Sequence, residues 1–230
     1  IYGPFSSLND KQEVAISQDG QKEAMEHAGR TGGLPFVGVG WYRTEFDVPQ
    51  FQAGKRATIL FDGAMSHANV YINGQKVGYW PYGYNSFHFD ITKYLKPGEK
   101  NTLAVRLENL PESSRWYPGA GLYRNVHLII TEDAYIPVWG TYITTPSVNE
   151  KFAKVNVRTK VVLPEGADPA KYSVETSVWN PNKQKLTAVR TSLAQMKYNN
   201  NQAEQEFVIQ APSLWSPEMP ALYSAETRLY

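Results

Sequence analysis

Short runs of alternating apolar and polar residues fill the first half of the chain from Trp41 onward. Alternation with a period of two is typical of strands that are buried on one face. These runs lie at 41–48, 57–63, 67–72, 86–91, 102–107 and 125–130. Because almost no helical periodicity separates them, the pattern predicts a β-sandwich or jelly roll.

Two residue pairs predict turns between strands of this first series. Asn73-Gly74 follows the run at 67–72 and precedes another short strand pattern, QKVGYW. A two-residue turn of this type needs positive φ at both positions, which Asn and Gly tolerate, so we expect a β-hairpin over 67–80. Pro97-Gly98 marks a second turn, before the strand at 102–107.

A second series of alternating runs begins after Asp133. Its members lie at 138–145, 154–163, 172–180, 186–193, 203–209 and 222–230. About seven short strands in about a hundred residues is typical of an immunoglobulin-like sandwich. The sequence therefore predicts an all-β chain: a jelly-roll, galactose-binding-like β-sandwich over 1–133, followed by an immunoglobulin-like β-sandwich over 134–230.

The two ends of the chain have a different character. Residues 1–35 are polar and Gly-rich, and only 21–27 has helix-forming composition, so we expect a long N-terminal loop that is truncated upstream. The last residues, 225–230, alternate like a strand and carry no turn signal, which indicates truncation at this end too. The interpretation is that the chain is a fragment.

Composition excludes several classes of protein. The 230 residues carry a formal net charge of +1, which leaves no basic field for a nucleic acid. There is no Cys, so neither a disulfide nor a thiolate metal site is expected. No apolar run approaches the roughly 18 residues of a membrane span. The four His residues have no metal-site spacing, and neither a metal nor a cofactor is predicted.

Several longer tracts of the first series form a recognisable order, at 40–46, 61–74, 78–79, 89–92 and 114–126. They resemble the N-terminal sugar-binding domain of glycoside hydrolase family 2, the β-galactosidase-like family. A further tract, 212–218 with Pro220 and 222–223, is similar to the immunoglobulin-like domain that comes next in this family.

The resemblance implies a retaining β-glycosidase as the parent protein, with a β-galactoside as substrate; a β-glucuronide or β-mannoside stays open. In this family two catalytic glutamates lie on a downstream TIM barrel, so no catalytic residue is expected here and the piece alone should be inactive. The implied partners are that barrel and a β-linked galactoside or related oligosaccharide, and a homo-oligomer stays open. The resemblance slightly favours a periplasmic or extracellular location.

The resemblance also points to one segment as a rim of the sugar pocket. The residues are Ser114, Arg115, Trp116 and Tyr117, just before a Gly-rich loop. Some relatives carry an acidic residue where this chain has Ser114, which weakens the expectation of a direct hydrogen bond from that position to substrate. Arg115 offers fixed donors to a sugar hydroxyl or to a carboxylate. Substrate contact and domain contact both stay open for this segment.

A second candidate is the aromatic cluster Trp80, Tyr82 and Tyr84 after the predicted hairpin. Aromatic faces stack on pyranose rings, and such a platform would suit a stand-alone carbohydrate-binding module. The alternative is that the rings pack the loop against the sandwich. An interaction domain without sugar affinity is a third hypothesis. Asn149-Glu150 imitates the family's catalytic Asn-Glu pair, but its surroundings predict a solvated hairpin loop.

Overall fold

The computed structural model describes residues 38–50, 54–109, 121–195 and 202–230. The chain divides into two compact units between Ile130 and Thr131. The predicted long loop at 1–35 and the helix-forming stretch 21–27 lie outside the described residues. Among the residues that are described, no helix has the length and apolar composition that a bilayer crossing needs.

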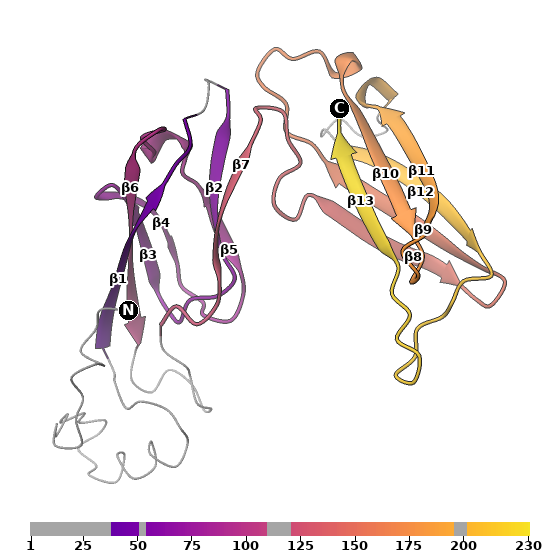
Figure 1. Cartoon of the computed structure of the whole chain (residues 1–230), viewed down its shortest axis with the longest axis horizontal. Helices are drawn as coiled ribbons and strands as arrows, with labels where there is room; N and C mark the ends of the chain where they lie inside the picture. The colour runs from indigo at the N-terminus through magenta and orange to yellow at the C-terminus, as the bar shows by residue number, and fades with distance from the viewer. Residues whose placement is uncertain (1–37, 51–53, 110–120, 196–201) are drawn as a thin grey trace, which may run out of the picture. The chain divides into compact units, whose positions relative to one another are not determined.

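The first unit is built from two facing antiparallel sheets (Figure 1). One sheet has the order β1-β6-β3-β4, and the other has the order β5-β2-β7. The strands are β1 (Gly38–Asp47), β2 (Arg56–Phe61), β3 (Ala68–Ile72), β4 (Gln75–Trp80), β5 (Phe87–Asp90), β6 (Lys100–Asn109) and β7 (Val126–Thr131). Each predicted run of the first series is thus a strand, with ends shifted by a few residues.

Alternation along these strands places one set of side chains between the two sheets. In β2 and β3 every second residue is buried. Phe61 and Phe87, on neighbouring strands, stack with ring centroids 4.8 Å apart. Burying a side chain of this size stabilises the fold by about 1.5–3 kcal/mol. The core of the first unit is therefore a single apolar cluster closed by aromatic rings.

The hairpin predicted over 67–80 is confirmed. β3 and β4 pair in antiparallel register, and Asn73 and Gly74 at the turn have φ of 50° and 80°. The amide of Asn73 also donates to Oδ1 of Asn101, a fully buried residue, at 2.7 Å. The turn is therefore tied to the sandwich by a side chain as well as by the strand ladder.

The second unit also has two antiparallel sheets, with orders β12-β9-β8 and β11-β10-β13. The strands are β8 (Thr141–Val148), β9 (Phe152–Lys160), β10 (Ser173–Trp179), β11 (Lys185–Ser192), β12 (Gln202–Gln210) and β13 (Ser224–Leu229). Within the described ranges, three short 3₁₀ turns accompany the strands, at Thr92–Tyr94 in the first unit and at Pro169–Lys171 and Leu193–Gln195 here. The all-β fold, a β-sandwich followed by a second β-sandwich, is confirmed.

Candidate functional site

The turn that follows β2 anchors both ends of the segment that carries the predicted rim. Met65 and Gly121 exchange two backbone hydrogen bonds, of 3.0 and 2.9 Å. The next residue, Ser66, accepts from the backbone N–H of Glu108 at 2.9 Å and donates its hydroxyl to the carbonyl of Glu108 at 2.8 Å. The chain before residue 110 and the chain after residue 120 are therefore held by two adjacent residues.

The predicted rim residues lie between these anchors along the chain. Ser114, Arg115, Trp116 and Tyr117 fall outside the described residues, so their role stays a prediction. Gly121, which closes the segment, has φ of 104° and lies so close to Tyr42 that a Cβ atom would come within 2.2 Å of the phenol oxygen. Any other residue would have to displace that ring, so glycine is required at this anchor.

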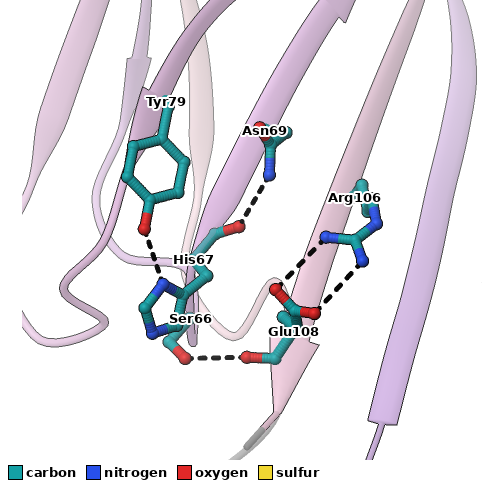
Figure 2. A network of polar contacts seen from close by, with 6 residues as sticks. All are labelled: Ser66, His67, Asn69, Tyr79, Arg106 and Glu108. Carbon is teal, nitrogen blue, oxygen red and sulfur yellow. Dashed lines mark hydrogen bonds and ion pairs between the residues drawn. The ribbon is translucent and has the colours of Figure 1, made fainter.

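A polar network surrounds the anchor (Figure 2). Arg106 donates from both guanidinium nitrogens to the two carboxylate oxygens of Glu108, at 3.3 and 3.2 Å. His67 Nδ1 lies 2.6 Å from the phenol oxygen of Tyr79, and the amide of Asn69 donates to the carbonyl of His67 at 3.1 Å. The network joins β3, β4 and β6 at the point where β6 leaves the sheet.

Glu108 is held in its ionised form. The hydrogen bonds from Arg106 keep the pKa of this carboxyl below its ordinary value, and the charges of Arg106 and His67 act in the same direction, while desolvation opposes them. A general acid must carry a proton near the working pH. Glu108 is therefore suited to fixing Arg106 in place and is a poor proton donor at neutral pH.

The aromatic candidates do not all face the same way. Trp80 packs on the core, with its ring 5.6 Å from that of Phe87, and its indole N–H donates to Oδ1 of Asn85 at 3.0 Å. Tyr82 and Tyr84 are 54% and 37% exposed, and their rings meet edge to face at 5.7 Å. The structure thus separates Trp80 from the two tyrosines; sugar stacking on these rings stays a prediction.

The loop of the two tyrosines is attached to the same turn. A Cβ atom added at Gly83 would lie 2.3 Å from the sulfur of Met65, so the loop backbone lies directly on that side chain. The hydroxyl of Tyr123 donates to the carbonyl of Gly83 at 2.8 Å. The loop at 81–85 and Gly121, the first described residue after position 120, therefore meet at Met65.

Other charged candidates have local roles. Arg124 donates to the carbonyl of Asp62 at 3.4 Å, and His127 Nε2 lies 3.0 Å from the Asp62 carboxylate. The Asn149-Glu150 pair lies in the exposed turn between β8 and β9, where Asn149 Oδ1 accepts from two backbone N–H groups, at 2.8 and 3.0 Å. The predicted hairpin loop is confirmed there. In the part of the chain that the structure describes, no three His, Asp or Glu side chains gather as a metal site would require.

The network around Ser66, Arg106 and Glu108 was not anticipated from the sequence. The register of β6 beside β3 brings these residues together, and Ser66 and Glu108 are 42 residues apart in the sequence. The one local signal was the alternation of Arg106 and Glu108 with buried Val105 and Leu107, which put both charged residues on the outer face.

Comparison with known proteins gives this geometry a context. Residues 34–132 match the family model described as "Glycosyl hydrolases family 2, sugar binding domain", and residues 135–230 match "Glycosyl hydrolases family 2". The chain belongs to glycoside hydrolase family 2. Its β-sandwich units correspond to the N-terminal sugar-binding domain and the immunoglobulin-like domain of that family.

Family 2 relatives of two activities match over most of the chain. The β-galactosidase BoGH2A of Bacteroides ovatus is 39% identical over 203 residues, which is 88% of this chain and 24% of that protein. A putative β-glucuronidase of Formosa agariphila is 37% identical, over 87% of this chain and 19% of that protein. A crystal structure of a family 2 member from Bacteroides cellulosilyticus superposes with a TM-score of 0.75 at 33% identity, over 84% of this chain and 25% of the other. The chain thus spans about a quarter or less of the length of these relatives.

Proposed function

We propose that this chain forms the non-catalytic N-terminal part of a retaining β-glycosidase that acts on β-galactosides. The observation that carries the proposal is the match to two consecutive domains of family 2 over residues 34–132 and 135–230. Identity of 39% to a β-galactosidase supports the galactoside. A β-glucuronide is the second candidate substrate, because a putative β-glucuronidase is 37% identical.

In this proposal the chemistry belongs to a TIM-barrel domain of the parent protein. A retaining glycosidase holds two carboxyl groups about 5–5.5 Å apart across the glycosidic bond. Glu108 is a poor general acid because Arg106 keeps it ionised, and both of its carboxylate oxygens, which a nucleophile would need, already accept from Arg106. Glu150 lies in an exposed turn. The chain alone is therefore without glycosidase activity.

The first unit would contribute one wall of the sugar pocket. The segment with Ser114, Arg115, Trp116 and Tyr117 would supply that wall, with Arg115 donating to a sugar hydroxyl or a barrel carboxylate. The hydrogen bonds of Met65 to Gly121 and of Ser66 to Glu108 support this role, because they fix the chain on both sides of the segment. A group that orients substrate must itself be held firmly.

A chimera tests the proposal, because a known β-galactosidase supplies the catalytic domain in place of the one proposed for the parent protein. Residues 34–230 replace the aligned part of the β-galactosidase BoGH2A, and hydrolysis of 4-nitrophenyl β-D-galactopyranoside is measured. We expect an active enzyme in which Arg115→Ala or Trp116→Ala lowers kcat/KM about tenfold, because each change removes a group that orients the sugar.

The matched control is Glu226→Gln, which alters an exposed residue of the second unit. It should leave kcat/KM of the chimera unchanged. The chimera's melting transition shows whether it folds. If it folds and both Arg115→Ala and Trp116→Ala leave kcat/KM unchanged, the proposed role of 114–117 as a wall of the pocket would be contradicted. A folded chimera that does not hydrolyse the galactoside would contradict the proposal that this chain can serve as the N-terminal part of a β-galactosidase.

A further inference from the structure

The outer face of the sheet β1-β6-β3-β4 carries a row of side chains that no comparison assigns. Trp41 pairs with Arg106, Arg106 pairs with Asn69, and Asn69 pairs with Tyr79, so the four residues cross the sheet in register. The apolar side chains next to them along each strand belong to or pack on the core. Trp41 and Tyr79 are 54% and 45% exposed. With strands about 4.8 Å apart, the row spans about 14 Å.

The first ring of this row is supported from the side. The rings of Trp41 and Tyr71 lie with centroids 5.6 Å apart and planes tilted by 35°. Ala104, between Arg43 and Tyr71 in the next row, is 8% exposed, so a small side chain lies beneath the larger ones. Trp41 therefore offers exposed aromatic surface in a fixed orientation, at little further cost in conformational entropy.

The centre of the row offers paired donors and acceptors. The Arg106 and Glu108 side chains are 27% and 34% exposed, so the ion pair is in contact with solvent. A guanidinium has five donor hydrogens, and a carboxylate accepts at about four sites, so the two bonds between them leave further capacity on both. Next to them lies Asn69, and at the far end lies the phenol of Tyr79, which His67 holds.

The charges of this face nearly balance, which selects the class of ligand. Arg106 is neutralised by Glu108, and Lys100 lies 3.9 Å from Glu45. Arg43, Asp47 and Lys76 lie on the same face by register, which leaves four cations against three carboxylates. A polyanion such as a nucleic acid would gain nothing from such a surface. A ligand with apolar faces and many neutral hydroxyl groups would use both the rings and the paired donors and acceptors.

A protein partner fits this face less well. A stable protein interface buries about 800 Å² on each partner around an apolar centre. Here the centre of the row is the Arg106–Glu108 pair, and covering it with protein would remove its water at a large desolvation cost. Sugar hydroxyls can replace that water with hydrogen bonds of the same kind.

We propose that this face binds an extended, neutral oligosaccharide with β-1,4 linkages. Pyranose rings would stack on Trp41 and Tyr79, and their hydroxyls would bond to Arg106, Glu108 and Asn69. An extended chain follows a row of this length, whereas an α-1,4-linked chain coils. The inference goes beyond the proposed function, because binding here requires no catalytic domain and is measured on this chain alone.

The experiment is a titration of the chain with cellohexaose and with β-1,4-galactohexaose, followed by amide NMR shifts and calorimetry. We expect saturable binding of at least one of them, with shifts centred on Trp41, Asn69 and Tyr79. Maltohexaose, which has α-1,4 linkages, should bind at least about tenfold more weakly. Trp41→Ala should weaken binding at least about tenfold, the size of a hot-spot truncation.

Trp41→Phe keeps a ring at this position and should retain part of the affinity, which guards against loss of folding in the alanine variant. Trp215→Ala is the matched control, because Trp215 is an equally exposed tryptophan of the second unit, at 59%. The Trp215→Ala variant should bind the oligosaccharide with the same affinity as the unchanged chain.

Several results would overturn the inference. These are no binding at millimolar sugar, equal binding of maltohexaose, shifts centred on Tyr82 and Tyr84, or self-association of the chain that Trp41→Ala abolishes. The last result would assign the face to a protein contact. None of them affects the test of the proposed function, which measures hydrolysis by the chimera.

Discussion

The two units are sandwiches of similar design, yet their cores are held in different ways. The first unit has one continuous apolar cluster between its sheets. The second has two smaller clusters, and along the inner side of β12 the buried Gln205 lies between Ala203 of one and Phe207 of the other. One core depends on close packing of rings, and the other includes a polar side chain at its centre.

Gln205 joins the two sheets of the second unit. Its amide nitrogen, on β12, lies within hydrogen-bond distance of the carbonyls of Val174 and Val189, at 3.0 and 2.8 Å, and of the hydroxyl of Thr191, at 3.1 Å. These partners belong to β10 and β11, in the opposite sheet. A buried polar contact of this kind fixes how the sheets align, which apolar burial alone does not do.

Phe61→Ala should give the largest effect and should be confined to the first unit. The residue is fully buried and stacks on Phe87, so truncation leaves a cavity that costs about 3–5 kcal/mol. Chemical unfolding followed by hydrogen exchange should show the first unit opening earlier, with the second unit unchanged. The control Tyr82→Ala removes an exposed ring and should change the free energy of unfolding by no more than about 0.5 kcal/mol. Equal loss in both units would mean that the two cores are not independent.

Gln205→Ala should have a smaller effect, confined to the second unit. It leaves two buried carbonyls with one partner fewer, which costs about 1–3 kcal/mol of unfolding free energy. Denaturant unfolding of the purified variant measures this loss. The neighbour Glu206, whose side chain forms an exposed ion pair with Lys154, supplies the control Glu206→Gln. If both variants lose equal stability, the polar contact between the sheets has no special role.

Glu108→Gln should show a smaller effect than Gln205→Ala, and the effect should depend on pH. The folded pKa of this carboxyl is lowered, so its ion pair with Arg106 adds stability above the ordinary value of 4.5 and loses it as the pH falls through the folded pKa. The difference in melting temperature between the chain and the variant should therefore shrink in acid.

A matched pair in the second unit sharpens that measurement. Arg228 and Glu226 are also two residues apart on one strand and lie 2.8 Å from each other, but their side chains are more exposed, at 60% and 46%. Glu226→Gln should change the melting temperature less than Glu108→Gln does, because water screens an exposed pair more. A larger change in Glu226→Gln would contradict the role given to the network around Ser66.

Strand positions and local turns could be predicted from the sequence because the physics that sets them is local. Alternation marked the buried residues of β2, β3 and β12, and Asn73-Gly74 carried the turn conformation in its own residue types. Long-range register carries no such local mark. The row from Trp41 to Tyr79 and the anchor at Ser66 exist only because β6 pairs with both β1 and β3.

The aromatic cluster shows the same limit. Trp80, Tyr82 and Tyr84 are neighbours in sequence, and the sequence left open whether they form a common sugar-stacking surface or pack the loop against the sandwich. Trp80 is the last residue of β4 and takes the inward position of that strand, whereas the tyrosines belong to the loop after it. Gln205 escaped prediction for a related reason, because a polar residue at an inward position is recognised only when its partners on the facing sheet are known.

The most direct test of the proposed role is a hydrolysis assay on the purified 230-residue chain. The substrates are 4-nitrophenyl β-D-galactopyranoside and the corresponding β-glucuronide, and the readout is release of 4-nitrophenol. We predict no release above the rate of the uncatalysed reaction, because the proposed function assigns the two catalytic carboxylates to another domain of the parent protein. Turnover at about 1 s⁻¹ or faster, abolished by Glu108→Gln or Glu150→Gln, would contradict the account.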